Sequence, residues 1–109
     1  MIRVMGLYRW AEGAHFDASR YASEHAELSR RLLTPLGLQR LELARFLSAG
    51  AARPGDLIAA TFADFVDLAS AQAALAQAGP ELAAHVESYS SLRPQINLCE
   101  LLEQPDPQA

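Results

Sequence analysis

The chain has 109 residues, half of them hydrophobic and a fifth of them charged, which fits one globular domain with a modest core. Its formal net charge is −4 and no run of basic residues interrupts it, so we expect no nucleic-acid partner. All nine basic residues are arginine, which excludes Schiff-base chemistry and phosphate binding by a lysine.

The only cysteine, Cys99, has no partner for an internal disulfide, which is typical of proteins in a reducing compartment. Residues 1–5 lack the long apolar stretch of a signal peptide, and no later window has the length of a membrane span. We therefore expect a cytoplasmic protein with no membrane partner.

The first third of the chain predicts a strand followed by a helix. Residues 2–10 are almost all β-branched, aromatic or apolar, which indicates a strand, and residues 11–15 then indicate a loop. Asp17 is a favourable N-cap, so a helix is expected to begin at Ala18. Phe16 lies where it can pack on Tyr21, in the arrangement called a hydrophobic staple.

One face of this helix is expected to be buried. Tyr21, His25, Leu28 and Leu32 recur at steps of four and three residues and form an apolar stripe that includes one histidine. The helix should end near residues 34–37, because proline disfavours a helical residue before it and glycine opens a turn.

The rest of the chain predicts two paired strands, a second helical region and a last strand. Strands are expected at residues 38–47 and 57–65, separated by a loop at 49–55. Asp67 can cap a helix over residues 68–78, which Gly79 and Pro80 should end before a further helical turn at 81–88. A strand at 93–102 completes a domain of residues 1–102, and residues 103–109 form a polar tail.

This order predicts a ferredoxin-like α+β domain, βαββαβ, with a four-stranded antiparallel sheet and its first and third strands in the centre. Alternation places Met5 and Leu7 opposite Tyr8, and Phe62 opposite Phe65, so both faces of the centre are apolar. Because helices cover only one face, we expect a second copy to cover the other and form a dimeric α+β barrel. The alternative is a monomer whose uncovered face is only partly apolar.

Several segments resemble the EthD family, named for a protein of bacterial ethyl tert-butyl ether degradation. The similarity is carried by residues 16–25 and 35–38, where the family typically has Phe-Asp, two aromatics and a histidine, and extends through residues 67–75, 79–82 and 89–94. Tyr21 and His25 match the motif, whereas Arg20 stands where the family usually has the first aromatic. The resemblance implies the dimeric α+β barrel fold. This fold occurs in monooxygenases, haem-dependent enzymes, isomerases and dehydratases.

His25 is the candidate catalytic residue, because an imidazole directed into a mostly apolar pocket of the barrel can exchange a proton near neutral pH. The alternative is a buried histidine with a structural hydrogen bond. Tyr8, Tyr21, Phe62 and His85 are the candidate ligand-binding residues, although such rings are also typical of an ordinary core.

No metal-ligand spacing, phosphate loop or dinucleotide motif is present, so we expect neither a metal nor a cofactor. A haem held by His25 follows only from analogy with the superfamily. Cys99 is expected to be a small core side chain, the alternative being a nucleophile paired with His25.

Two functions are compatible with these features. The first is a protein of small-molecule catabolism that binds a small apolar organic compound near His25, with acid–base catalysis of the isomerase, lyase or cofactor-free monooxygenase type. The second is a non-catalytic binding dimer that supports a monooxygenase system.

Overall fold

The computed structural model describes residues 1–47 and 50–107 and confirms the predicted α+β fold. The elements in chain order are β1 (Ile2–Arg9), α1 (Ala18–Arg20), η1 (Tyr21–His25), α2 (Ala26–Leu33), η2 (Thr34–Leu36), β2 (Arg40–Arg45), β3 (Leu57–Phe65), α3 (Leu68–Val86) and β4 (Gln95–Glu100). The strands form one four-stranded antiparallel sheet in the order β2-β3-β1-β4, with β1 and β3 in the centre as expected. No helix among the described residues is long and apolar enough to cross a bilayer.

The first helical region begins at the predicted residue and is held by the predicted contacts. The Asp17 carboxylate accepts a hydrogen bond from the Arg20 backbone N–H, which satisfies one of the free donors of the first turn. The Phe16 and Tyr21 rings pack with their centroids 5.0 Å apart. The helix then passes through a π-helical segment, η1, which the sequence periodicity did not predict and which buries Tyr21 and His25.

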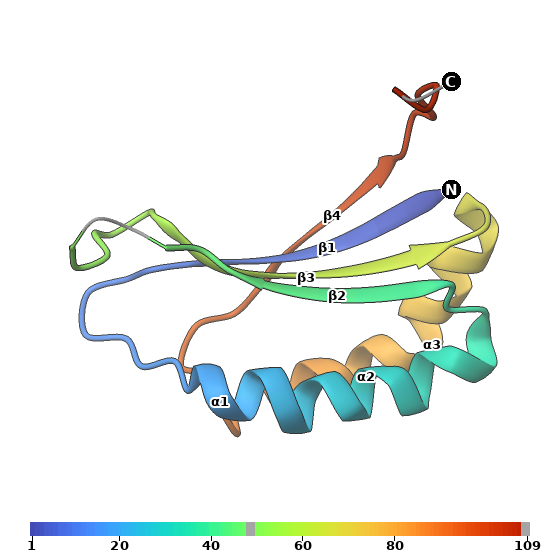
Figure 1. The fold of residues 1–109 in the computed structure, drawn as a ribbon. Coiled ribbons are helices and arrows are strands. Elements are labelled where there is room, and N and C mark those ends of the chain that lie inside the picture. The colour runs from blue at the N-terminus through green and yellow to red at the C-terminus, as the bar shows by residue number, and fades with distance from the viewer. Residues whose placement is uncertain (48–49, 108–109) are drawn as a thin grey trace.

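The second helix differs from the prediction, because Gly79 and Pro80 do not end it. A single helix, α3, runs from Leu68 to Val86 with Pro80 inside, so the two shorter helical segments predicted here are wrong. Proline removes one helical hydrogen bond, which bends a helix that tertiary packing supports. Gly79 has no Cβ to collide with the proline ring, and Figure 1 shows α3 changing direction between its yellow and orange parts.

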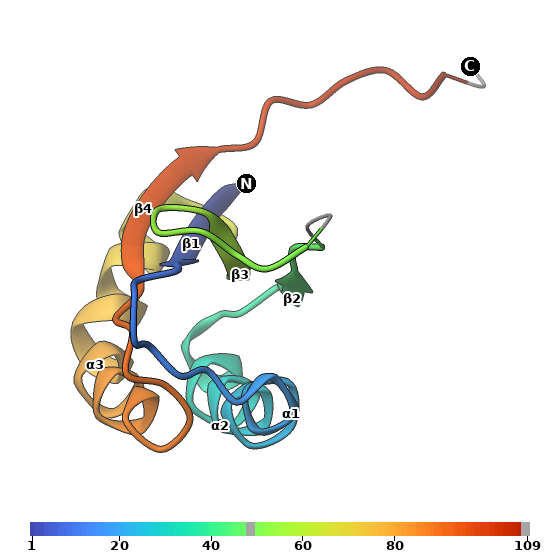
Figure 2. The same ribbon diagram turned by 90° about the vertical axis from the view of Figure 1, so that its left-hand side faces the viewer.

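The strands are close to their predicted positions but shorter at some ends. The third strand coincides with residues 57–65, whereas β2 and β4 are confined to the residues that pair with a neighbour. Gly55 has a φ of 92°, in the left-handed region that favours glycine, within the turn before β3. The predicted loop at 49–55 includes Ala49, which lies outside the described residues. Residues 101–107 form neither helix nor strand and lead away from the sheet in Figure 2.

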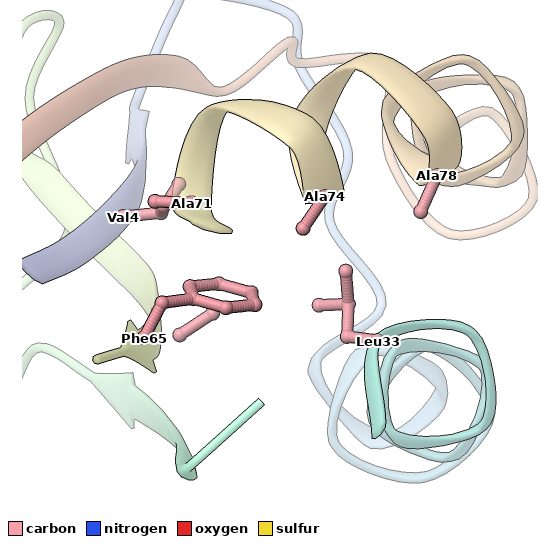
Figure 3. Close-up of a cluster of buried hydrophobic side chains, with 7 residues drawn as sticks. Val4, Leu33, Phe65, Ala71, Ala74 and Ala78 are labelled. Carbon is pink, nitrogen blue, oxygen red and sulfur yellow. The ribbon is translucent and has the colours of Figure 1, made fainter. Parts of the chain in front are cut away.

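All helices cover one face of the sheet, which we call the helix-side face, and the opposite face is left open (Figure 1). Val4 and Phe65 of the helix-side face pack with Leu33 of α2 and with the alanines of α3 in a buried cluster (Figure 3). Ala71 and Ala74 are almost completely buried, so α3 approaches the sheet closely at its first turns. A second buried cluster, which includes Tyr8 and Tyr89, lies apart from this one.

The open face is apolar in its centre and charged at one end. Met5, Leu7 and Phe62 lie on it, as the alternation predicted, and each is partly exposed. The sequence pattern did not reveal that the Arg3 guanidinium binds both carboxylate oxygens of Asp64, at 2.8 and 2.9 Å, and lies 5.0 Å from the Phe62 ring centroid. Asp64 is only 3% exposed, because this ion pair covers it.

Candidate functional site

A cavity of about 240 Å³ lies between the helices and the helix-side face of the sheet. It exists because many of its lining positions carry small side chains, which include Gly6, Ala63, Ala74, Gly79 and Ala83. A Cβ built on Gly79 would meet nothing within 4 Å, so this part of α3 leaves the space in front of it empty. The lining is mainly apolar, which is typical of sites for small organic ligands.

This cavity is distinct from the pocket expected within the dimeric barrel. It is formed by residues of one chain and lies on the helix side, whereas the face expected to meet a second copy is the other one. Its opening lies between the end of α3 and β4, where the lining residues Ala83, Arg93 and Ile96 are exposed. At this opening the Arg93 guanidinium donates to the Glu87 carboxylate at 2.8 Å.

The His25 imidazole lies in the wall of the cavity. It belongs to the π-helical segment η1 and is only 6% exposed. Burial, with a smaller contribution from the neighbouring His85, lowers the pKa of His25 from 6.5 to about 4. His25 is therefore neutral at pH 7 and presents an uncharged imidazole to any ligand in the cavity.

His25 is hydrogen-bonded to a second histidine. The Nδ1 atoms of His25 and His85 lie 3.1 Å apart, and their rings are stacked with centroids 5.3 Å apart and planes 10° from parallel. On its other side, the His85 Nε2 lies 3.3 Å from the Ser88 hydroxyl. The chain therefore places a polar path, His25–His85–Ser88, between the cavity wall and the exposed end of α3.

Aromatic rings fix the position of His25. Tyr21 stacks on it with a centroid distance of 6.0 Å, and the Tyr89 ring lies 4.9 Å away. The Tyr8 and Tyr89 hydroxyls are hydrogen-bonded to each other at 2.5 Å, and the Tyr21 hydroxyl is hydrogen-bonded to Thr61 at 2.6 Å. Burial raises the pKa of Tyr8, Tyr21 and Tyr89 above the usual tyrosine range, so these hydroxyls stay protonated.

The candidate residues from the sequence occupy different places around this cavity. His25 and Tyr8 line it, while Tyr21 and His85 contact His25 from outside the lining. Phe62 pairs in register with Met5 on the open face, so it does not line this cavity. Cys99 pairs in register with Arg3 on the open face, so the sheet separates it from His25 and the Cys–His nucleophile alternative has no structural basis.

Several residues of the site were not identified from the sequence. Ser29, Thr61 and Tyr89 surround the cavity or His25, and Ser88 contacts His85. Ser29 lies four residues after His25, so the helical stripe could have revealed it. The others come from distant segments, and no spacing relates them to His25.

Arg20, which departs from the family motif, connects the two helical regions. Its guanidinium donates to the Ser88 backbone carbonyl at 2.9 Å and forms an ion pair with Glu24 at 3.2 Å. An arginine at this position therefore holds the end of α3 beside the first helix, near the His85–Ser88 contact.

A metal site is not formed by the described part of the chain, because no three histidine, cysteine or acidic side chains cluster there. His25 and His85 are the nearest approach to such a group, and their Nδ1 atoms are directed at each other rather than at a shared ion.

We expect the burial of His25 to make folding pH-dependent. Its folded-state pKa of about 4 lies below the ordinary value of 6.5, so the unfolded chain binds the proton more tightly between these values. The free energy of unfolding should fall by up to about 3 kcal/mol as the pH drops from 7 to 4. Urea unfolding of the wild type and of His25→Leu over this pH range measures the effect. Parallel stability curves for the two proteins would contradict it.

Comparisons with known proteins bear on the fold. No protein-family model matches the sequence, and no curated protein is significantly similar to it. Two solved structures are similar over almost the whole chain. One is an EthD-like protein from Ralstonia eutropha JMP134, with a TM-score of 0.79 at 21% sequence identity. The match covers 95% of this chain and 94% of that protein's chain.

The second is an ethyl tert-butyl ether (EthD) family protein from Bacillus halodurans C-125. It has a TM-score of 0.63 at 17% identity, with 94% of this chain and 99% of that chain covered. Both neighbours agree with the resemblance that residues 16–25 indicated. The chain therefore has the fold of the EthD-like proteins.

Proposed function

We propose that this chain is an EthD-like protein of small-molecule catabolism that binds a small apolar organic compound in the helix-side cavity. The observation that supports this most is the imidazole of His25 in the wall of an otherwise mainly apolar cavity of about 240 Å³. Such a cavity favours apolar ligands, and its few polar groups determine how a ligand is oriented. The proposal includes no metal or cofactor.

Acid–base catalysis by His25 is the reaction class that this arrangement supports. A neutral imidazole accepts a proton from a bound compound and can return it at another position, as isomerases, lyases and cofactor-free monooxygenases require. Burial lowers the pKa of His25, so it begins the reaction as a base. A negative charge that develops on the ligand would favour the protonated imidazole and assist the transfer.

A non-catalytic binding role is the second candidate, and one observation favours it. The hydroxyls of Ser29, Thr61 and Tyr8 in the cavity wall all have partners within the protein, so none is held ready as a second catalytic group opposite His25. In this role a dimer would hold a labile or toxic intermediate for a monooxygenase system.

We also propose that the chain acts as a cytoplasmic homodimer in which a second copy covers the open face. Met5, Leu7 and Phe62 form an apolar centre on this face, and no helix covers it (Figure 1). Pairing two such faces would remove this surface from water and complete a dimeric α+β barrel.

Ligand binding is tested by closing the cavity. Ala83 is exposed and lines the opening, so the side chain of Ala83→Trp can cover it without displacing the core. We expect this variant to bind p-xylene about tenfold more weakly than the wild type or not at all. Ala84→Trp is the matched control, since Ala84 is exposed on the same helix but does not line the cavity. Equal binding of p-xylene by both variants, measured by NMR titration, would contradict the location of the site.

Catalysis is separated from binding by His25→Leu, which keeps most of the side-chain volume and removes the base. We expect the wild type to exchange the α-protons of cyclohexanone with deuterated water, and the variant to lose about a hundredfold or more of this rate while still binding cyclohexanone. Proton NMR follows the exchange. If the wild type shows no exchange above background, the result favours the non-catalytic binding role over the catalytic one.

The dimer is tested by placing a charge on the open face. Leu7→Arg should weaken self-association about a hundredfold or more, because a second copy would bury an unpaired guanidinium. Ser23→Arg, on the exposed side of the first helical region, is the control and should leave the dimer intact. Sedimentation velocity at micromolar concentration measures both, and a wild type that sediments as a single subunit would overturn the dimer.

A further inference from the structure

We propose that the cavity selects a small apolar molecule that carries one hydroxyl donor, such as a phenol or enol, and that His85 is the positioning residue that makes His25 the acceptor for it. This inference rests on the proposed function, because it names the ligand class of the same cavity. It follows from which polar atoms of the wall are already engaged.

The hydroxyl groups around the cavity are hydrogen-bonded within the protein. Ser29 donates to the His25 backbone carbonyl at 2.8 Å. The Thr61 and Tyr21 hydroxyls share a hydrogen bond at 2.6 Å, and the Tyr8 hydroxyl bonds to Tyr89 at 2.5 Å. Each pair uses one of its two hydroxyl hydrogens, so at most one hydrogen per pair remains besides Arg93 at the opening. A ligand rich in acceptors would therefore leave most of its acceptors unpaired.

The His25 imidazole has one nitrogen left for a ligand. Its Nδ1 is engaged with His85, and within residues 1–47 and 50–107 no group is hydrogen-bonded to its Nε2. Whether this Nε2 donates or accepts depends on which tautomer the neighbouring residues select.

The contacts of His85 select that tautomer. The Ser88 hydroxyl donates its only hydrogen to the His85 backbone carbonyl at 2.8 Å, so towards His85 Nε2, at 3.3 Å, it is an acceptor. His85 then carries its proton on Nε2 and leaves Nδ1 bare. Because the two Nδ1 atoms are 3.1 Å apart and share one proton, His25 carries it and donates.

The result is a His25 whose Nε2 is an unprotonated acceptor in the cavity wall. The tautomer is fixed from outside the cavity, in the way that a second group orients a catalytic or metal-bound imidazole. A hydroxyl on an otherwise apolar ligand is the group that this acceptor would pair with. An ether or carbonyl oxygen placed at this nitrogen would face it with another lone pair, so a ketone would have to present a C–H group there instead.

The tautomer is measured directly by two-bond ¹H–¹⁵N NMR of the imidazoles in ¹⁵N-labelled wild type at pH 7. We expect a protonated Nδ1 and an unprotonated Nε2 for His25, and the reverse for His85. His85→Leu should remove this preference, and His15→Leu, in an exposed loop, should preserve it. A protonated Nε2 on His25 in the wild type would overturn the inference whether or not a ligand binds.

The ligand class is measured by comparing p-cresol with p-xylene, which have similar shapes and differ in one hydroxyl. We expect the wild type to prefer p-cresol by about tenfold, the value of one well-formed hydrogen bond. The preference should disappear in His25→Leu and decrease in His85→Leu. Equal binding of both probes by the wild type would overturn this inference and leave the proposed cavity site standing, whereas binding of neither would overturn both.

Discussion

The structure depends on a neutral imidazole held in an apolar gap between the sheet and its helices. His25 is almost completely buried, with Tyr21 and Tyr89 against its faces and His85 on its Nδ1. Leaving a buried polar group without a partner would cost free energy, and His85 supplies that partner from a helix about 60 residues away in sequence. The site therefore exists only when α3 and the first helical region are packed together.

Small side chains create the space that this imidazole faces. Filled cores are close-packed, so a cavity persists only where the chain lacks the atoms to fill it. Gly6 on β1 and Gly79 on α3 are two such positions, and the bend of α3 at Pro80 lies beside one of them. The departure from a regular helix thus lies beside the cavity, and the tight packing at Ala71 lies before both in α3.

The two faces of the sheet have separate chemistry. The helix-side face holds the cavity and the buried aromatic rings, whereas the open face combines an apolar centre with the Arg3–Asp64 ion pair. Such a pair, nearly covered already in one chain, would set the orientation of a partner more than its affinity. The proposed dimer contact and the proposed ligand site therefore lie on opposite sides of one sheet.

The sequence predicted the features that depend on local patterns. The Asp17 cap and the alternation in β1 and β3 depend on neighbouring residues only, and the structure has both. The predicted stripe of the first helix is confirmed in part, because Tyr21 and His25 are buried whereas Leu28 and Leu32 are half-buried. The ends of the helices were harder to predict. Tertiary packing lets α3 continue past Gly79 and Pro80, although both residues locally disfavour a helix.

The site itself was only partly predictable. The stripe placed His25 towards the sheet, but the contact of His25 with His85 joins two helices and is not encoded in any spacing. Phe62 lies on the open face, as the alternation in β3 predicted, but the sequence did not show that a cavity forms on the other face. The π-helical segment at Tyr21 and His25 also has no signature in the periodicity.

We propose that a ligand meets His25 in the helix-side cavity and not on the open face. A crystal structure of the protein with p-cresol would locate the ligand. We expect the ring of p-cresol between α3 and the sheet, with its oxygen within hydrogen-bonding distance of His25 Nε2. A p-cresol molecule bound on the open face or between two copies, with the helix-side cavity empty, would contradict it.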